Sequence, residues 1–353
     1  MLVVIVTVAR GAGAKCSEVL VEQLVLSAPG RAEWTEVPAP TLAGGADALV
    51  RPIAVATCDL DTAINSGAFP LPLPYALGHE FVAEVVEVGA DVTSVRTGDR
   101  VAVPFQINCG YCVFCQRGLT QSCTTVPRGS AYGLGAIGRG DWGGAVADLI
   151  RVPYADAMLL PFPSGVNPAA VASLDNLPDG WRTVAPYLDD LDDKRVLVVG
   201  GISIGLYAVA VARALGADVT YVDGHPRRTE VAAKLGASVV APGAGKVGRF
   251  PVTVSTSGTR DGLLLALDST EPGGVCTDTG VFIGDVALPL QQLYTTGIRF
   301  VTGRVAARHE LPRVLDLVAS GRLDPGVVTA TTAAWSDAPA AWSTHRDKLV
   351  LIR

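Results

Sequence analysis

Four cysteines between residues 109 and 123 constrain the fold of this chain more than any other feature. Cys109, Cys112, Cys115 and Cys123 have the spacing C-x2-C-x2-C-x7-C. Four thiolates bind tetrahedral zinc at about 2.3 Å, and short C-x2-C turns wrap sulfurs around one ion. The spacing therefore predicts a structural zinc with no open coordination position, which organises a loop. Buried free thiols and an iron–sulfur cluster are the alternatives.

The rest of the composition indicates a globular intracellular protein. The chain has 353 residues, enough for two domains, and 49% of them are hydrophobic. Its net charge of −6 argues against nucleic acid and against an anionic membrane surface. No apolar run reaches the ~20 residues of a membrane-spanning helix. We therefore expect a cytoplasmic location. In a cytoplasmic protein, clustered thiols are more often metal ligands than disulfides.

The N-terminal half is typical of antiparallel strands. Residues 48–55, 81–88 and 100–103 are short apolar alternations separated by turn signals rich in glycine and proline. Residues 2–9 are apolar but follow Met1 without a basic stretch, so they make a poor secretory signal. We interpret them as an extra strand or as the product of a start codon assigned too early.

The pattern changes after Asp175. Strands are predicted at 195–199, 218–222, 252–255 and 274–279, and helices at 204–215 and 228–235. Strands that alternate with helices at this spacing indicate a parallel sheet with crossover helices. The tail has a predicted helix at 311–319 and a final strand at 348–352, and it is expected to complete the first domain.

A second metal site is suggested by residues that are separate in sequence. Cys58 follows a predicted strand, and His79 and Glu80 lie between a proline-rich turn and another strand. A catalytic zinc has about three protein ligands and one open position for water or substrate. Cys58 alone is equally consistent with a buried free thiol.

Several motifs together resemble the zinc-dependent medium-chain dehydrogenase/reductase family, which includes the alcohol dehydrogenases. They are Gly78-His79-Glu80, Gly98-Asp99-Arg100-Val101, the four-cysteine segment after Pro104, and the opening segments Ala28-Pro29-Gly30 and Glu36-Val37-Pro38. The resemblance implies an α/β fold. A GroES-like β-barrel domain (1–175 and 302–353) would surround a Rossmann doubly wound parallel sheet (176–301).

The resemblance also implies a ligand set for the second zinc. Cys58 and His79 match the family's ligands, and Asp175 matches the next one, with Asp179 as the fallback and a helix N-cap as the alternative role of Asp175. Glu80 matches the acidic residue that binds or tunes the metal. Such a zinc polarises an alcohol or carbonyl oxygen as a Lewis acid.

A glycine turn predicts the dinucleotide site. Gly200, Gly201, Ile202, Ile204 and Gly205 lie in a strand–turn–helix segment that resembles G-x-G-x-x-G, in which backbone N–H groups receive a pyrophosphate. Ile202 stands at the position of the middle glycine, which normally lets the pyrophosphate approach.

The next strand ends at a residue that bears on the choice of cofactor. Asp223 follows that strand at the position of an acid that binds the adenosine ribose and repels a 2′-phosphate. This favours NAD. NADP stays possible, because Arg227 and Arg228 are near and an arginine can bind that phosphate.

The proton relay of the family is missing. The position that usually holds Ser or Thr is Leu60, and the position of a relay His is Ala63. Neither side chain can transfer a proton. Asp59 is the main substitute candidate, with Asp61 and Thr62 as others; alternatively, the substrate supplies its own donor.

The favoured activity is the interconversion of a secondary or cyclic alcohol and its carbonyl with NAD(P). The alternatives are reduction of a conjugated C=C or an iminium bond, and a non-catalytic dinucleotide-binding protein. Residues Leu60, Phe69, Phe105 and Trp142 are expected to line an apolar pocket or to belong to the core. A homodimer or homotetramer is expected, with residues 274–300 at its edge.

Overall fold

The computed structural model describes residues 19–138, 140–244, 247–282 and 284–353. The predicted strand at residues 2–9 lies outside them. In the first lobe, buried and more exposed side chains alternate along β1, so that one face of this strand lies in an apolar core. The central strands β3, β5 and β6 are instead buried along most of their length. Strand β3 pairs antiparallel with β5, β7 and β16, and β5 pairs with β6. Strands β1, β2 and β4 form a smaller sheet beside it.

The strands of this lobe are β1 (Leu20–Ala28), β2 (Arg31–Pro38), β3 (Ala48–Ala56), β4 (Tyr75–Ala76), β5 (Glu80–Val88), β6 (Arg100–Val103), β7 (Ile150–Val152), β8 (Leu160–Pro161), β15 (Thr331–Ala334) and β16 (Leu349–Ile352). Its helices are α1 (Asp59–Asn65), α2 (Val113–Gln116), α3 (Ala155–Met158), α4 (Pro168–Val171), α10 (Ala307–Ala319) and α11 (Ala338–Thr344), with 3-10 turns at Thr120–Ser122, Pro325–Val328 and Trp335–Asp337.

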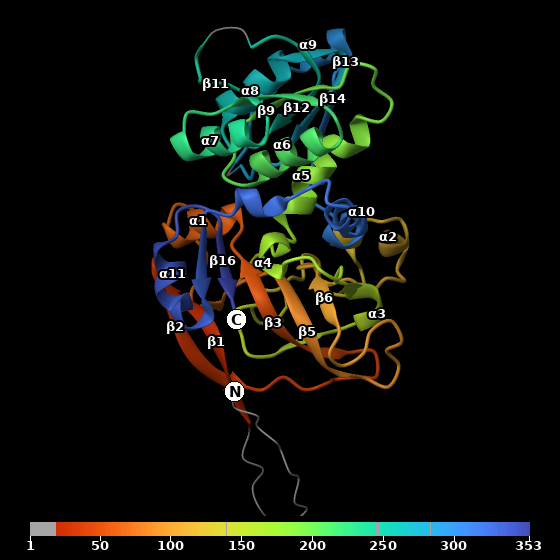
Figure 1. Ribbon diagram of the computed structural model, residues 1–353, viewed down its shortest axis with the longest axis vertical. Coiled ribbons are helices and arrows are strands. Elements are labelled where there is room, and N and C mark those ends of the chain that lie inside the picture. Colours follow the sequence, from red (N-terminus) through yellow and green to blue (C-terminus); the bar gives the residue numbers. More distant parts are fainter. Residues whose placement is uncertain (1–18, 139, 245–246, 283) are drawn as a thin grey trace, which may run out of the picture.

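The second lobe is a parallel sheet with the strand order β11-β10-β9-β12-β13-β14. This is the doubly wound order of a Rossmann domain, in which ligands bind where the order reverses, between β9 and β12. Figure 1 shows this lobe above the first one, with α5 running between them. The predicted α/β fold, a GroES-like domain with a Rossmann domain, is confirmed.

The strands of the second lobe are β9 (Arg195–Val199), β10 (Asp218–Val222), β11 (Ser238–Val240), β12 (Phe250–Ser255), β13 (Thr270–Asp278) and β14 (Arg299–Thr302). Its helices are α5 (Asn176–Val184), α6 (Ile204–Ala214), α7 (Pro226–Lys234), α8 (Arg260–Asp268) and α9 (Leu290–Thr296), with a 3-10 turn at Ala185–Tyr187.

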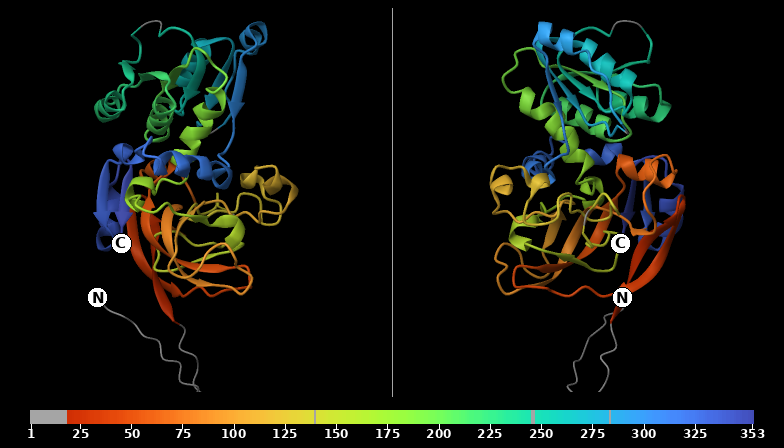
Figure 2. Two further views of the ribbon diagram at one scale, coloured as in Figure 1. Left: turned by 45° about the vertical axis from the view of Figure 1, so that its right-hand side comes forward. Right: turned by 180° about the vertical axis from the view of Figure 1, so that it is seen from behind.

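The tail returns to the first lobe, as both views in Figure 2 show. Strand β16 pairs with β3, so the end of the chain completes the sheet in which the candidate site lies. Helix α10 begins at Ala307, four residues before the predicted start at 311, and it contains Pro312. The domain boundaries at 175/176 and 301/302 remain a proposal. Strand β14 ends at Thr302, one residue beyond the proposed boundary at 301/302.

Helix α5 brings the two lobes together. Gly180 lets α5 approach α6 closely, because a Cβ there would lie 2.7 Å from the Cβ of Tyr207. Side chains of both helices share one apolar core with residues of the first lobe such as Val82 and Ala102. This packing fixes the start of α5 beside the start of α6, where the candidate site residues meet. Among the described residues, no helix is both long and apolar enough to cross a membrane.

Candidate metal centres and dinucleotide site

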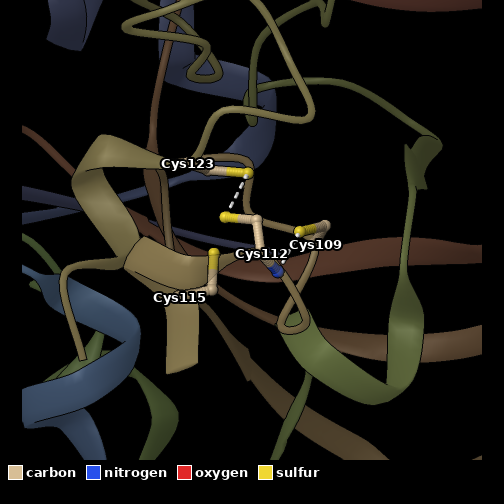
Figure 3. A group of neighbouring side chains, drawn as sticks. All are labelled: Cys109, Cys112, Cys115 and Cys123. Atoms are coloured by element: carbon tan, nitrogen blue, oxygen red, sulfur yellow. Dashed lines mark hydrogen bonds between the residues drawn. The ribbon is translucent and has the colours of Figure 1, made fainter. Parts of the chain in front are cut away.

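The four clustered cysteines converge in one loop of the first lobe. Figure 3 shows their sulfur atoms directed toward one another, and all of these atoms lie within 4.8 Å of each other. The Sγ atoms of Cys112 and Cys123 are 4.0 Å apart. Sulfurs bound to one zinc at 2.3 Å would be separated by about 3.8 Å, so the arrangement fits a tetrahedral ion.

The local hydrogen bonds favour thiolates in this loop. The backbone N–H groups of Thr124 and Cys115 lower the pKa of Cys112 to about 5. The Cys109 sulfur accepts from Cys112 N at 3.3 Å and from Thr125 Oγ1 at 3.1 Å. Burial raises the pKa of Cys115 to about 12, and a cation bound by the four sulfurs would favour its thiolate form.

The second group of ligands forms where two strand ends and a helix start meet. Cys58 precedes α1, His79 immediately precedes β5, Glu80 is the first residue of β5, and Asp175 precedes α5. One ligand atom from each lies within 4.8 Å of the others. The structure therefore brings together all four residues predicted from separate parts of the sequence.

The polar atoms of this cluster fit a metal ion. Both ring nitrogens of His79 are buried and make no hydrogen bond within the described residues. Nε2 lies 3.5 Å from Asp175 Oδ2, and Nδ1 lies 4.0 Å from Asp61 Oδ2. A fully buried imidazole without a partner is costly, and a cation between His79, Cys58 and Asp175 would satisfy it.

The thiol of Cys58 points to the same conclusion. Burial raises its pKa well above the ordinary value, so a thiolate here needs a positive ion. Asp61 orients this residue: its carboxylate accepts from Cys58 N at 2.8 Å, while Asp61 N donates to Cys58 Sγ at 3.3 Å. Asp61, one of the other candidates for proton transfer, therefore holds Cys58 in place.

Asp175, and not the fallback Asp179, lies in the cluster. Asp175 occupies the N-cap position of α5, but within the described structure its side chain makes no capping hydrogen bond. It is directed at His79 instead. Asp179 is paired with Arg182, and burial raises its pKa to about 7.

Glu80 is held by a residue that sequence reasoning missed. Its Oε2 accepts from Ser173 Oγ at 2.5 Å and from Lys348 Nζ at 3.0 Å. Lys348 also donates to the carbonyl of Thr57 and to Asn176 Oδ1, and it is almost fully buried. Burial favours the neutral amine, but Glu80 outweighs it and holds the pKa of Lys348 above its ordinary value. No local motif marks Lys348, which precedes the last strand.

Asp59, the predicted substitute for the proton relay, makes its contacts outside the group of Cys58, His79, Glu80 and Asp175. Within the described chain, the Asp59 carboxylate makes its hydrogen bonds with Ser203 and Ile204 at the start of α6. These contacts give no support to proton transfer by Asp59. Leu60 and Ala63 lie on α1 and are half-buried.

The four apolar residues predicted to line a pocket lie near the cluster or in the adjoining core. Leu60, Phe69 and Trp142 pack against the same core of the first lobe. The ring of Phe105 lies 5.5 Å from that of His79, centroid to centroid. The cluster therefore has an apolar side.

The glycine turn has the geometry of a dinucleotide fingerprint. Gly200 and Gly201 have φ values of +73° and +96°, which favour glycine. A Cβ on Gly205 would lie 2.1 Å from the carbonyl oxygen of Gly200, so the turn and α6 pack too closely for a side chain. Ile202 is half-buried and Ile204 begins the helix. The turn has the shape of a dinucleotide site. The backbone N–H groups of Ser203 and Ile204, however, already donate to the Asp59 carboxylate.

Asp223 lies at the end of β10, as predicted, with both carboxylate oxygens hydrogen-bonded. Arg228 donates to it from Nε at 2.7 Å and from Nη2 at 2.9 Å. Tyr221 Oη and His225 N complete the set. Although burial opposes ionisation, these donors hold the pKa of Asp223 below its ordinary value. Arg228 is therefore neutralised, whereas Arg227 contacts Val328 and Asp347.

Comparison with known proteins places the chain in a family. The profile of the alcohol dehydrogenase GroES-like domain matches residues 44–163, and that of the zinc-binding dehydrogenase domain matches residues 203–320. A probable zinc-binding alcohol dehydrogenase of Mycobacterium tuberculosis is 32% identical over 92% of this chain and 85% of its own length. L-threonine 3-dehydrogenase of Edwardsiella ictaluri is 30% identical over 75% of this chain and 78% of its own. The structure of alcohol dehydrogenase TADH from Thermus sp. ATN1 superposes with a TM-score of 0.85 at 30% identity, covering 94% of this chain and 99% of that one. The chain belongs to the zinc-dependent medium-chain alcohol dehydrogenase family, whose members are NAD(P)-dependent oxidoreductases.

Proposed function

We propose that this protein interconverts a secondary or cyclic alcohol and its carbonyl compound by hydride exchange with NAD. The observation that carries the proposal is the buried cluster of Cys58, His79, Glu80 and Asp175, in which His79 has no hydrogen-bond partner among the described residues. A zinc held there would supply Lewis-acid polarisation of the reacting oxygen, and the nicotinamide would supply or accept the hydride.

The residues of the cluster have distinct roles in this proposal. Cys58, His79 and Asp175 would hold a catalytic zinc, and a site with three protein ligands can accept a substrate oxygen. Glu80 adjusts the charge around the metal, either as a ligand or through its neighbours. Its Oε1 is buried without a hydrogen-bond partner in the described structure, whereas Oε2 is held by Lys348 and Ser173.

The apolar side of the cluster supports a substrate without many polar groups. Leu60, Phe69, Phe105 and Trp142 would exclude water from the reacting carbon, and a small polyol would leave its hydroxyls unpaired there. The relative named L-threonine 3-dehydrogenase supports a secondary alcohol, because carbon 3 of threonine bears one.

The absence of a relay hydroxyl supports a second candidate reaction. Leu60 and Ala63 cannot accept the proton that alcohol oxidation releases. Hydride delivery to a conjugated C=C or to an iminium does not need that relay. Reduction of such a bond is therefore the alternative activity of the same site.

NAD is proposed over NADP, and an oligomer over a monomer. Asp223 would repel a 2′-phosphate, and its ion pair with Arg228 removes the free guanidinium that would bind one. Strand β14 lies at the edge of the described parallel sheet, and the nearby α9 exposes Leu290 and Tyr294. These features support a homodimer or homotetramer formed through residues 274–300.

Zinc analysis tests the metal centre. The wild-type protein should hold two zinc ions per chain, and Cys58→Ala should lose one. Cys276→Ala is the matched control, because Cys276 is also a buried thiol but lies outside both clusters. One zinc in the wild type, unchanged by Cys58→Ala, would contradict the assignment.

A substrate panel tests the reaction. Secondary and cyclic alcohols, ketones, enones and cyclic imines should be assayed side by side with NADH or NAD and with their phosphorylated forms. Turnover confined to enones or imines would replace the alcohol proposal with the alternative. Turnover with primary alcohols alone would contradict the proposed substrate class.

A further inference from the structure

We propose that Asp59 occupies the pyrophosphate position of the dinucleotide site, so that a nicotinamide dinucleotide must displace this carboxylate before it can bind. The inference rests on the proposed function for the identity of the dinucleotide. It assigns to Asp59 control of cofactor affinity in place of proton transfer.

The geometry of the contact is that of an anion at a helix N-terminus. Both Asp59 oxygens lie 3.0 Å from Ser203 N, and Oδ2 lies 3.3 Å from Ile204 N. The Ser203 hydroxyl also donates to Oδ1. The carboxylate therefore takes the two backbone N–H groups that open α6, a helix of 11 residues.

These two N–H groups are the ones that a pyrophosphate would use. They follow the glycine turn after β9, at the point where the strand order reverses, and a dinucleotide places its pyrophosphate against the N-terminus of that helix. Within the described structure α6 has no capping bond from its own N-cap side chain, Ser203. The cap comes instead from Asp59, 144 residues away in the chain.

A carboxylate and a pyrophosphate cannot share this position. Each is an anion that needs the same N–H groups, and the two would repel each other at short distance in a partly buried site. Ile202 adds to the obstruction, because its side chain stands where a glycine would leave space. The sequence and the structure thus identify two obstacles at one place.

The contact also joins the two lobes. Asp59 begins α1 of the first lobe and Ser203 precedes α6 of the second. The backbone N–H of Asp59 donates to Asn176 Oδ1 at 3.2 Å, and this hydrogen bond holds the start of α1 beside the start of α5. Displacement therefore breaks an interlobe contact, and the cofactor affinity should be correspondingly low.

The test compares ligands with and without a pyrophosphate. Dissociation constants for NADH, ADP-ribose and adenosine should be measured by calorimetry on the zinc-loaded wild-type protein, on Asp59→Asn and on Asp59→Ala. We expect both variants to bind NADH and ADP-ribose about tenfold more tightly, because the loss of one charge-assisted competitor frees the N–H groups. Adenosine affinity should change less than about twofold, since adenosine has no group at this position.

Asp156→Asn is the control for the change of net charge. Asp156 is a carboxylate that caps backbone N–H groups of Thr93 and Ser94 elsewhere in the first lobe. This variant should leave all three affinities unchanged. Equal ADP-ribose affinity in the wild type and in both Asp59 variants, or an equal gain for adenosine, would overturn the inference while leaving the proposed function intact.

Two further outcomes are informative. If neither the wild type nor the variants bind NADH, the proposed function itself fails. If the variants do not fold, a crystal structure of the wild type with ADP-ribose decides the question. The Asp59 carboxylate should then be out of hydrogen-bonding reach of Ser203 N and Ile204 N, and retained contacts would overturn the inference.

Discussion

Replacement of Lys348 by methionine should destabilise the protein strongly, because Lys348 is the cation beside the buried Glu80. The side chain of Lys348 is 1% exposed and that of Glu80 is 0% exposed. Methionine has a similar length and no charge. The variant would leave the Glu80 carboxylate without its ion pair, and it would remove a donor from the Thr57 carbonyl and from Asn176 Oδ1.

The expected loss follows from the cost of an unpaired buried charge. Removing one partner of a buried ion pair costs about 3–5 kcal/mol. Burial already raises the pKa of Glu80 to about 7, so protonation of the carboxyl is accessible and limits the penalty. We therefore expect Lys348→Met to lower the free energy of unfolding by about 3 kcal/mol, the lower end of that range.

Urea unfolding at fixed pH and fixed zinc concentration measures this loss, because metal bound only to the folded state contributes to stability. With a slope of about 3 kcal/mol per M, the midpoint should fall by about 1 M. The matched control is Lys234→Met, which removes an exposed lysine paired with Glu230 and should cost less than about 0.5 kcal/mol.

The double variant Glu80→Gln/Lys348→Met separates the ion pair from simple packing. Replacing both charges removes the unpaired buried carboxylate, so the double variant should be more stable than Lys348→Met alone by about 1–2 kcal/mol. The reasoning would be refuted if Lys348→Met cost less than about 1 kcal/mol, or if the double variant were no more stable than the single one.

Three further predictions concern other parts of the structure. Cys112→Ser should lose one of two zinc ions and retain the other. Zinc analysis of this variant and of Cys58→Ala measures the loss, and loss of both ions from Cys112→Ser would contradict two independent sites. Leu60→Thr should restore a hydroxyl at the relay position and raise the rate of alcohol oxidation at neutral pH by about tenfold, as steady-state kinetics would measure, whereas an unchanged rate would show that another group transfers the proton. Although burial works in the opposite direction, hydrogen bonds from Ser94 and Thr93 lower the pKa of Asp156 to about 2. The stability that this carboxylate contributes is therefore present above its unfolded pKa of about 3.9 and is lost as the pH falls through about 2. After a discount for solvent screening, we expect Asp156→Asn to lower the free energy of unfolding by about 0.5–1 kcal/mol at pH 7. Below about pH 2 the variant and the wild type should be equally stable.

Local motifs in the sequence were sufficient for the fold and for much of the site. The four cysteines lie within one loop, so their spacing alone predicts that they meet. The alternation of strands and helices after Asp175 predicts the parallel sheet, because β9, β10 and β11 pair in sequence order, as do β12, β13 and β14, and only the pairing of β12 with β9 joins strands that are distant in sequence. Cys58, His79 and Asp175 required the family resemblance, since they lie on separate elements and no spacing relates them.

The contacts that sequence could not predict are those between distant elements. Lys348 reaches Glu80 across 268 residues, and it does so because β16 pairs with β3 and places the end of the chain beside the start of β5. Asp59 was predicted to replace the proton relay that Leu60 and Ala63 cannot supply. The first turn of α1 instead directs it toward α6, where N–H groups attract a carboxylate more strongly than the acidic surroundings of the cluster do.

These two contacts belong to one hydrogen-bond network that joins the metal cluster to the dinucleotide turn. Asn176 Oδ1 accepts from Lys348 Nζ at 2.9 Å, from Ser203 Oγ at 2.9 Å and from Asp59 N at 3.2 Å. The single hydroxyl proton of Ser203 is within reach of both Asn176 and the Asp59 carboxylate, and it can be donated to only one of them at a time. When Asp59 leaves the turn, Ser203 is free to donate to Asn176, the acceptor that also holds Lys348 beside Glu80. A continuous set of hydrogen-bonded side chains therefore connects the N–H groups at the start of α6 with Lys348, the cation beside Glu80.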